Sequence, residues 1–185
     1  MAASVDVLTI GYAHERVASS VVLVRENDVV IVVDPGMVAS RAAILDPLHA
    51  LGVHQDDVTD VIFSHHHPDH TLNAALFGHA RVHDVWATYF NDHWGERTDV
   101  IDGAPSVTIW DTPGHTPQDI STLVRTAAGL VVCTHLWWSL AGPEVDPRAS
   151  DQAMLESSRA RVLALDPVTI IPGHGAPFSP ADLAR

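Results

Sequence analysis

Five side chains of metal-ligating types fall within six positions, from His65 to His70. Residues two apart in an extended segment point to the same side, so His65 and His67 can bind one ion while His66 faces elsewhere. The chain then turns into a helix, which lets Asp69 and His70 address a second point close to the first. Imidazole suits zinc, iron or manganese near neutral pH. The segment therefore predicts ligands for two neighbouring cation positions.

Three further histidines follow predicted strands over residues 106–110, 129–133 and 168–171, namely His115, His135 and His174. Strand ends at one edge of a sheet assembly converge, and loops there hold functional side chains on a rigid frame. We therefore expect these imidazoles to join the 65–70 segment in one metal site. For His135 a structural role, filling a space or forming a hydrogen bond nearby, is the alternative.

Strand and helix signals alternate in two successive halves of the chain. Strands are predicted over 5–10, 18–24, 29–33, 60–63, 106–110, 119–125, 129–133 and 168–171, and helices over 40–52, with Pro47 kinking or dividing it, and over 150–165. Residues 81–103 show no clear period and are interpreted as a lid. We predict the α/β class with an αββα sandwich, in which two mixed β-sheets pack face to face with helices on the outer faces. Residues 1–185 are predicted to form one domain.

Composition narrows the classes of partner. The chain carries 23 acidic and 10 basic residues, for a formal net charge of -13 at pH 7, which repels phosphate backbones and makes nucleic acid an unexpected partner. No apolar run reaches the ~20 residues of a membrane span, and no export signal is recognised at the start. The single cysteine, Cys133, is expected in the core, with a metal-bound thiol as the alternative. We predict a cytoplasmic protein with a small-molecule substrate and no membrane partner, and a homo-oligomer stays open.

The spacing of these ligands resembles that of a known family. His-x-His-x-Asp-His over 65–70, Gly-His at 114–115 and Gly-His at 173–174 resemble the hallmarks of the metallo-β-lactamase superfamily. The turn at 33–36 looks like that family's Asp-x-Gly, in which the aspartate, here Asp34, supports the loop of metal ligands. In this chain that metal loop would be residues 65–70. Stretches 112–121 and 159–178 resemble a compact single-domain subgroup. The resemblance implies one or two divalent ions, zinc first and iron or manganese as alternatives, bound in two sets: His65, His67 and His115, then Asp69, His70 and His174.

His135 departs from the family pattern, because it stands where a bridging aspartate is expected. A carboxylate offers two oxygens to two cations, whereas a neutral imidazole has one lone pair and cannot bridge closely spaced ions. We expect a second ion that binds more weakly, lies further away or recruits another carboxylate, such as Glu144 or Asp146. Alternatively, His135 binds the second ion from one side, or the site holds one ion.

The predicted function is a metal-dependent hydrolase that uses a metal-bound hydroxide on a small ester, thioester, lactone or amide. Asp69 is the predicted catalytic proton acceptor and donor. The alternatives are a phosphodiesterase or ribonuclease of the same fold, an iron dioxygenase, and a non-catalytic metal-binding protein that has lost the bridging aspartate. Trp137 and Trp138 either wall a substrate pocket or pack against the following helix. Surface or supporting roles are predicted for His14, His49, His54, His66, His79, His83 and His93.

Overall fold

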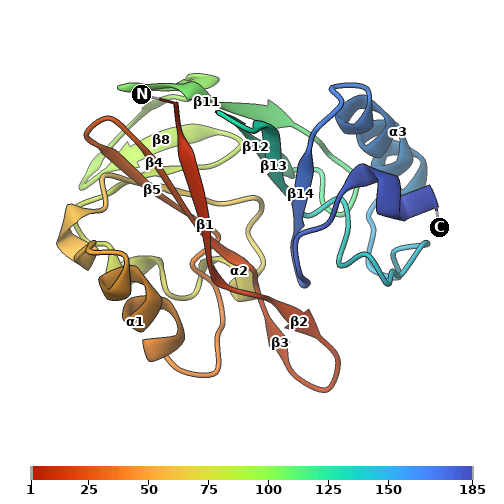
Figure 1. Cartoon of the computed structure of the whole chain (residues 1–185), viewed down its shortest axis with the longest axis horizontal. Helices are drawn as coiled ribbons and strands as arrows, with labels where there is room; N and C mark the ends of the chain where they lie inside the picture. Colours follow the sequence, from red (N-terminus) through yellow and green to blue (C-terminus); the bar gives the residue numbers. More distant parts are fainter. Residues whose placement is uncertain (1, 185) are drawn as a thin grey trace.

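The computed structural model describes residues 2–184 and contains two mixed β-sheets (Figure 1). The first sheet has seven strands in the order β1-β4-β5-β6-β7-β8-β9, with β5, β6 and β7 parallel and the other pairs antiparallel. Its strands are β1 (Ser4–Thr9), β4 (Val21–Glu26), β5 (Val29–Val33), β6 (Asp60–Ile62), β7 (Arg81–His83), β8 (Ala87–Phe90) and β9 (His93–Glu96).

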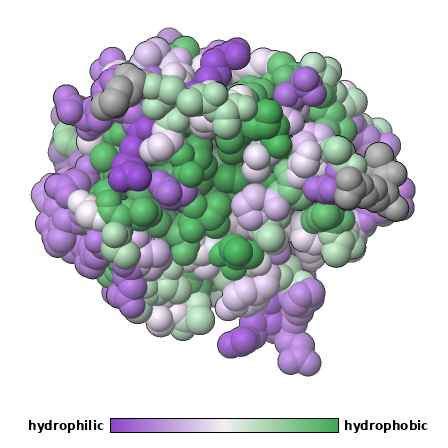
Figure 2. Space-filling model, in the orientation of Figure 1, coloured by the Kyte–Doolittle hydropathy of each residue, from purple (hydrophilic) through white to green (hydrophobic). Residues whose placement is uncertain are grey.

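The second sheet has five strands in the order β10-β11-β12-β13-β14, and its last pair is parallel. Its strands are β10 (Val100–Ile101), β11 (Ala104–Asp111), β12 (Ile120–Thr126), β13 (Gly129–Thr134) and β14 (Thr169–Pro172). A separate hairpin of β2 (Tyr12–Ala13) and β3 (Val17–Ala18) projects from the body, and its hydrophilic tip stands out at the bottom of Figure 2.

Helices cover the outer faces of the two sheets. In Figure 1, α1 (Ala42–Ala50) lies on the outer side of the first sheet and α3 (Gln152–Leu163) on the outer side of the second, while the short α2 (Pro68–Thr71) follows β6. Short 3-10 turns occupy Gln55–Asp57, Ala74–Leu76 and Pro180–Ala184. Within residues 2–184, no helix combines the length and hydropathy of a membrane span.

Three apolar clusters account for these layers. Strand β4 shows how, because Val22 and Val24 point to the cluster between the sheets, whereas Val21 and Leu23 point to the cluster beneath α1. A third cluster, which includes Leu155, joins α3 to the second sheet. Both faces of the inner strands are thus covered, and this explains their continuous β-branched runs. The fold is the predicted αββα sandwich.

Two local predictions differ from the structure. Residues 81–103 form the short strands β7, β8, β9 and β10 rather than a lid. Strand β9 is exposed along its whole length, so its sequence lacks the alternation that marks a half-buried strand. Pro47 lies inside α1 without dividing it. Cys133 lies in the cluster between the sheets, as expected for a core thiol.

Candidate metal centre

Loops at the ends of four strands bring their histidines together. His65 follows β6 of the first sheet, whereas His115, His135 and His174 follow β11, β13 and β14 of the second. The ring of His65 lies 5.0 Å from that of His115 and 4.6 Å from that of His135, and the rings of His135 and His174 are 5.0 Å apart, measured between centroids. The site therefore forms only where the two sheets meet.

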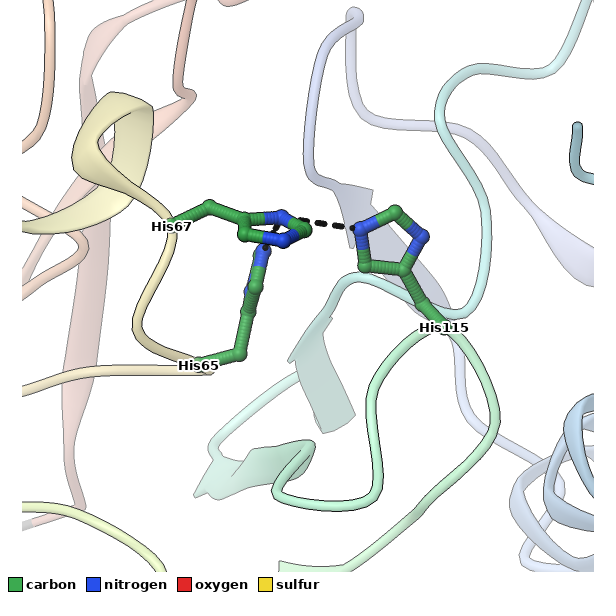
Figure 3. A group of neighbouring side chains, drawn as sticks. All are labelled: His65, His67 and His115. Atoms are coloured by element: carbon green, nitrogen blue, oxygen red, sulfur yellow. Dashed lines mark hydrogen bonds between the residues drawn. The ribbon is translucent and has the colours of Figure 1, made fainter. Parts of the chain in front are cut away.

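The first set of ligand atoms comes from His65, His67 and His115, whose rings turn toward one another in Figure 3. His67 Nδ1 lies 3.0 Å from His65 Nε2 and 3.2 Å from His115 Nε2. Nitrogen atoms bound at about 2.0–2.1 Å to a tetrahedral zinc ion lie about 3.3 Å apart. These three nitrogens are thus spaced as the ligands of one ion would be.

The second set comes from Asp69, His70 and His174. Asp69 Oδ2 lies 3.5 Å from His70 Nε2 and 3.5 Å from His174 Nε2. Asp69 and His70 belong to α2, which begins with Pro68. Proline suits this first position because a backbone N–H there would have no partner within the helix. The helix start aims both side chains at the point faced by His174. Two ligand sets therefore lie side by side.

Two buried carboxylates fix which nitrogen of their histidine faces the site. His115 Nδ1 lies 2.7 Å from Asp146 Oδ2, and His70 Nδ1 lies 2.8 Å from Asp34 Oδ2. An ionised carboxylate only accepts hydrogen bonds, so in each pair Nδ1 carries the proton and Nε2 offers its lone pair to the site. Asp34 also accepts a hydrogen bond of 2.6 Å from the backbone N–H of Ser64, which ties the metal loop to the end of β5.

A backbone carbonyl does the same for His174, whose Nδ1 donates to the Ala18 oxygen at 2.9 Å. The Nε2 atom of His70 is buried and has no hydrogen-bond partner among the described residues. Such an orphaned acceptor is costly in a protein interior unless a proton or a cation satisfies it. Nitrogen lone pairs that converge with one carboxylate oxygen are the donors that zinc-type ions prefer. The residues therefore fit a divalent cation.

His135 lies between the two sets, with its ring 4.6 Å from that of His65 and 5.0 Å from that of His174. Its Nε2 lies 3.1 Å from His174 Nε2, whereas its Nδ1 is buried without a partner among the described residues. A Cβ atom on Gly173 would overlap the His135 ring, so glycine at 173 makes room for this imidazole. The ligand atom of His135 also groups with those of His65 and His70, one from each set, and with those of His115 and Asp146. Because a neutral imidazole has one lone pair, His135 can bind a single ion from this position but cannot bridge two.

The pKa values of the innermost histidines favour ligation. Burial, and then the charges of His70 and His115, lower the pKa of His65 well below its ordinary value. Burial, followed by the charges of His65 and His70, does the same for His135. These rings stay neutral at pH 7, so a cation need not displace a proton from the atom it binds.

A cavity of about 370 Å³ opens above both ligand sets. Trp138 lines it and donates its indole N–H to Asp146 Oδ2 at 2.9 Å, whereas Trp137 packs in the core against α3, where Arg159 lies over its ring. One tryptophan thus follows each of the two alternatives. The complete lining is Ala13, His14, Val17, His67, Pro68, Asp69, His115, His135, Trp138, Arg148 and His174.

Several roles at this site were not foreseen from the sequence. Asp146 was considered as a replacement bridging ligand, but its Oδ2 binds the side of His115 that faces away from His67. Glu144 is exposed and lines no part of the cavity. His14 lines the cavity from the projecting hairpin, and Arg148 lines it from the loop that follows β13. Only the proximity of Asp146 and His135 in the chain hinted at that loop.

The other histidines occupy supporting or surface positions. His66 Nε2 contacts Asp84 Oδ2 at 3.0 Å, and His83 Nε2 contacts the buried Asp60 at 2.7 Å. The supporting role predicted for these two is consistent with both contacts. Exposed positions hold the remaining four, which are His49, His54, His79 and His93.

Comparison with known proteins places the chain in a family. Residues 14–122 match the model of the metallo-beta-lactamase superfamily. Metallo-beta-lactamase domain-containing protein 1 of Xenopus laevis is 35% identical over 190 residues, which cover 95% of this chain and 81% of the frog protein. The human protein of the same name is 39% identical over 158 residues, which cover 80% of this chain and 59% of the human one, so this chain spans little more than half of that relative.

Solved structures show the same fold at lower identity. A Thermotoga maritima protein named for its likeness to the metallo-beta-lactamases superposes with a TM-score of 0.73 at 22% identity, over 97% of this chain and 100% of that one. A B. thuringiensis protein with N-decanoyl-L-homoserine bound at its active site has a TM-score of 0.65 at 20% identity, over 83% of this chain and 80% of that one. With these matches and the converging histidines, the chain belongs to the metallo-beta-lactamase superfamily.

Proposed function

We propose that this chain is a metal-dependent hydrolase, loaded with zinc, that cleaves a small ester, thioester, lactone or amide. The observation that carries the proposal is the placement of two ligand sets side by side beneath one open cavity of about 370 Å³. A purely structural zinc site closes its coordination with protein ligands, whereas a catalytic one keeps a position open to solvent. Here the cavity reaches the ligands His67, Asp69 and His174 directly.

A zinc-type ion, when bound, supplies a water of pKa about 7 and polarises the scissile carbonyl. The chain's own residues orient and protect this chemistry. The carboxylate of Asp69, which belongs to the second set, also lines the cavity, where it can accept the proton of the attacking water and return it to the leaving group. Trp138, Val17 and Pro68 form apolar walls that hold the substrate and limit access of water.

A solved structure of the same fold supports a carbonyl substrate. The B. thuringiensis structure holds N-decanoyl-L-homoserine at its active site, which makes lactones and related acyl compounds the first class to assay on this chain. The net charge of -13 weighs against a phosphodiesterase that grips a nucleic acid backbone. An enzyme that acts on a small molecule, with zinc as its metal, fits these observations best.

The test uses the full chain reconstituted with zinc, and its metal content is measured by mass spectrometry. Hydrolysis is followed on an N-acyl homoserine lactone, a 4-nitrophenyl ester, an acyl thioester, an anilide and single-stranded RNA. We expect turnover of at least one carbonyl substrate, and a loss of about 10²–10⁴-fold in Asp69→Asn. His93→Ala, at a highly exposed position on β9, is the matched control and should keep full activity.

The outcomes separate the remaining candidates. Cleavage of RNA alone would assign the site to phosphodiester chemistry. Full zinc occupancy with no turnover on the whole panel would mark the chain as a metal-binding protein without catalysis, and would overturn the proposal.

A further inference from the structure

Among the described residues, one arginine lines the cavity above the ligand sets, and it is Arg148. It shares that cavity with His67 and His115 of the first ligand set and with Asp69 and His174 of the second. Arg148 therefore borders the space in which a substrate would lie. The rest of the cavity wall combines apolar residues, histidines and the single carboxylate of Asp69.

The loop that carries Arg148 is fixed to the metal site. The backbone N–H of Arg148 donates to Asp146 Oδ1 at 2.8 Å, and the other oxygen of that carboxylate binds His115 Nδ1. Two residues further, the backbone N–H of Ser150 donates to the His115 oxygen at 2.9 Å, and its hydroxyl donates to the Gly114 oxygen at 3.1 Å. The backbone of the loop is thus tied to the candidate ligand His115 both before Arg148, through Asp146, and after it, through Ser150.

The guanidinium itself has no partner among the described residues. Three other arginines are paired, Arg25 with Asp6, Arg81 with Asp60, and Arg97 with two aspartates. Arg148, in contrast, is exposed, lines the cavity and shows no side-chain hydrogen bond or ion pair among the described residues. In a chain of net charge -13, an unpaired guanidinium on the wall of this cavity makes the cavity locally attractive to anions.

We propose that Arg148 binds an oxyanion group, a carboxylate or a phosphate, on the substrate, so that the enzyme prefers small anionic substrates over neutral ones. The inference rests on the hydrolase proposed above and names the substrate class of the same site. A guanidinium presents a planar fork of donors that matches a carboxylate or phosphate with two parallel hydrogen bonds. The loop that carries Arg148 is tied to His115 through Asp146, so an anion bound by the guanidinium would bring the scissile bond near the ligand sets.

The experiment compares two esters with the same leaving group, 4-nitrophenyl acetate and the monoanionic 4-nitrophenyl hemisuccinate. In Arg148→Gln we expect the KM for the hemisuccinate to rise about tenfold, because a charge-assisted hydrogen bond is lost, while kcat/KM for the acetate changes less than twofold. Arg125→Gln is the matched control, because Arg125 is exposed on β12 and does not line the cavity. Arg148→Lys keeps the charge without the fork and should recover part of the loss. Equal losses on both esters in Arg148→Gln would overturn the proposal.

Binding measurements identify the anion and keep the inference testable by itself. Succinate monomethyl ester and methyl phosphate are titrated by calorimetry into the zinc-loaded wild type and into Arg148→Gln, so that binding to the metal is common to both proteins. A tenfold weaker affinity in the variant for one compound only assigns that oxyanion as the ligand. If no ester is hydrolysed but this difference is found, the hydrolase proposal fails and the anion site stands. Unchanged affinity for both compounds overturns the anion site.

Discussion

Replacement of the two carboxylates behind the ligand histidines should weaken the two ions separately. Asp146→Asn removes the charge that faces His115 Nδ1 at 2.7 Å, and Asp34→Asn removes the charge that faces His70 Nδ1 at 2.8 Å. Each histidine belongs to a different ligand set. Each substitution should therefore act on the ion of its own set and leave the other ion nearly unchanged.

The magnitude follows from the contacts. Asparagine has almost the same shape as aspartate, and its oxygen can still accept one hydrogen bond, so the fold around it persists. What is lost is the charge that fixes the tautomer and raises the basicity of the histidine, and such a loss costs 10- to 100-fold in metal affinity, or about 1.4–2.8 kcal/mol. Asp146 also holds Trp138 and the N–H of Arg148, whose hydrogen bonds are 2.9 and 2.8 Å long.

The assay measures zinc affinity by competition with a chromogenic chelator in two backgrounds, each with one ligand set disabled. In His174→Ala only the first set is complete, so Asp146→Asn should weaken the remaining ion and Asp34→Asn should change it less than threefold. In His115→Ala the order should be reversed. Asp92→Asn, a highly exposed aspartate outside the site, is the control in both backgrounds.

Two patterns would refute this reasoning. If both substitutions weakened zinc equally in both backgrounds, the carboxylates would be acting through the global charge of the protein and not through their own histidines. Equal affinity in all variants would show that these histidines are not ligands.

Three further substitutions have expected outcomes. Gly36→Ala should lower the zinc content and destabilise the fold by about 1–3 kcal/mol in urea unfolding, because a Cβ at Gly36 overlaps the backbone of Asp69. Asp60→Asn should cost about 2 kcal/mol at pH 7 by removing charged hydrogen bonds such as that of Arg81. It should also flatten the loss of stability in acid: burial raises the pKa of Asp60, but hydrogen bonds from His83 and Arg81 bring it below 3.8, so the carboxylate stabilises the fold above pH 3.8 and this share disappears as the pH falls further. His135→Asp should tighten the second zinc ion at least tenfold, or about 1.4 kcal/mol, measured by chelator competition.

Each of these has a contrary result. Full zinc occupancy in Gly36→Ala would mean that the metal loop tolerates the displaced backbone. An acid-unfolding curve of Asp60→Asn parallel to that of the wild type would remove Asp60 from the pH dependence. A lower zinc stoichiometry in His135→Asp would show that the imidazole is itself an essential ligand.

Sequence patterns predicted the layers well where both faces of a strand are buried. The β-branched runs that became β4 and β5 have their apolar side chains shared between two clusters, and nothing in the local sequence competes with that outcome. Residues 81–103 were misinterpreted because β8 and β9 pair at the open edge of the first sheet, where exposed side chains need not alternate.

In the site too, features set by the local sequence were predicted, whereas those set by tertiary contacts were not. Ligand types and spacing pointed to the seven side chains that the structure brings together, because a loop at a strand end has few directions to face. The roles of Asp146 and Arg148 depend on where the loop after β13 folds back onto His115, and that is a tertiary contact between residues 31 positions apart or more. His135 stayed ambiguous in the sequence, since only the space left by Gly173 shows how its ring fits.

The ligand sets draw on both halves of the chain, with His65 and His67 carried by the first sheet and His115 and His174 by the second. A bound cation would therefore act as a removable cross-link between the two sheets. By mass action, an ion present at 100 times its dissociation constant adds about 2.7 kcal/mol to the free energy of unfolding. The fraction of folded protein would then depend on the concentration of metal in its surroundings. When metal is scarce, the protein would lose stability as well as activity.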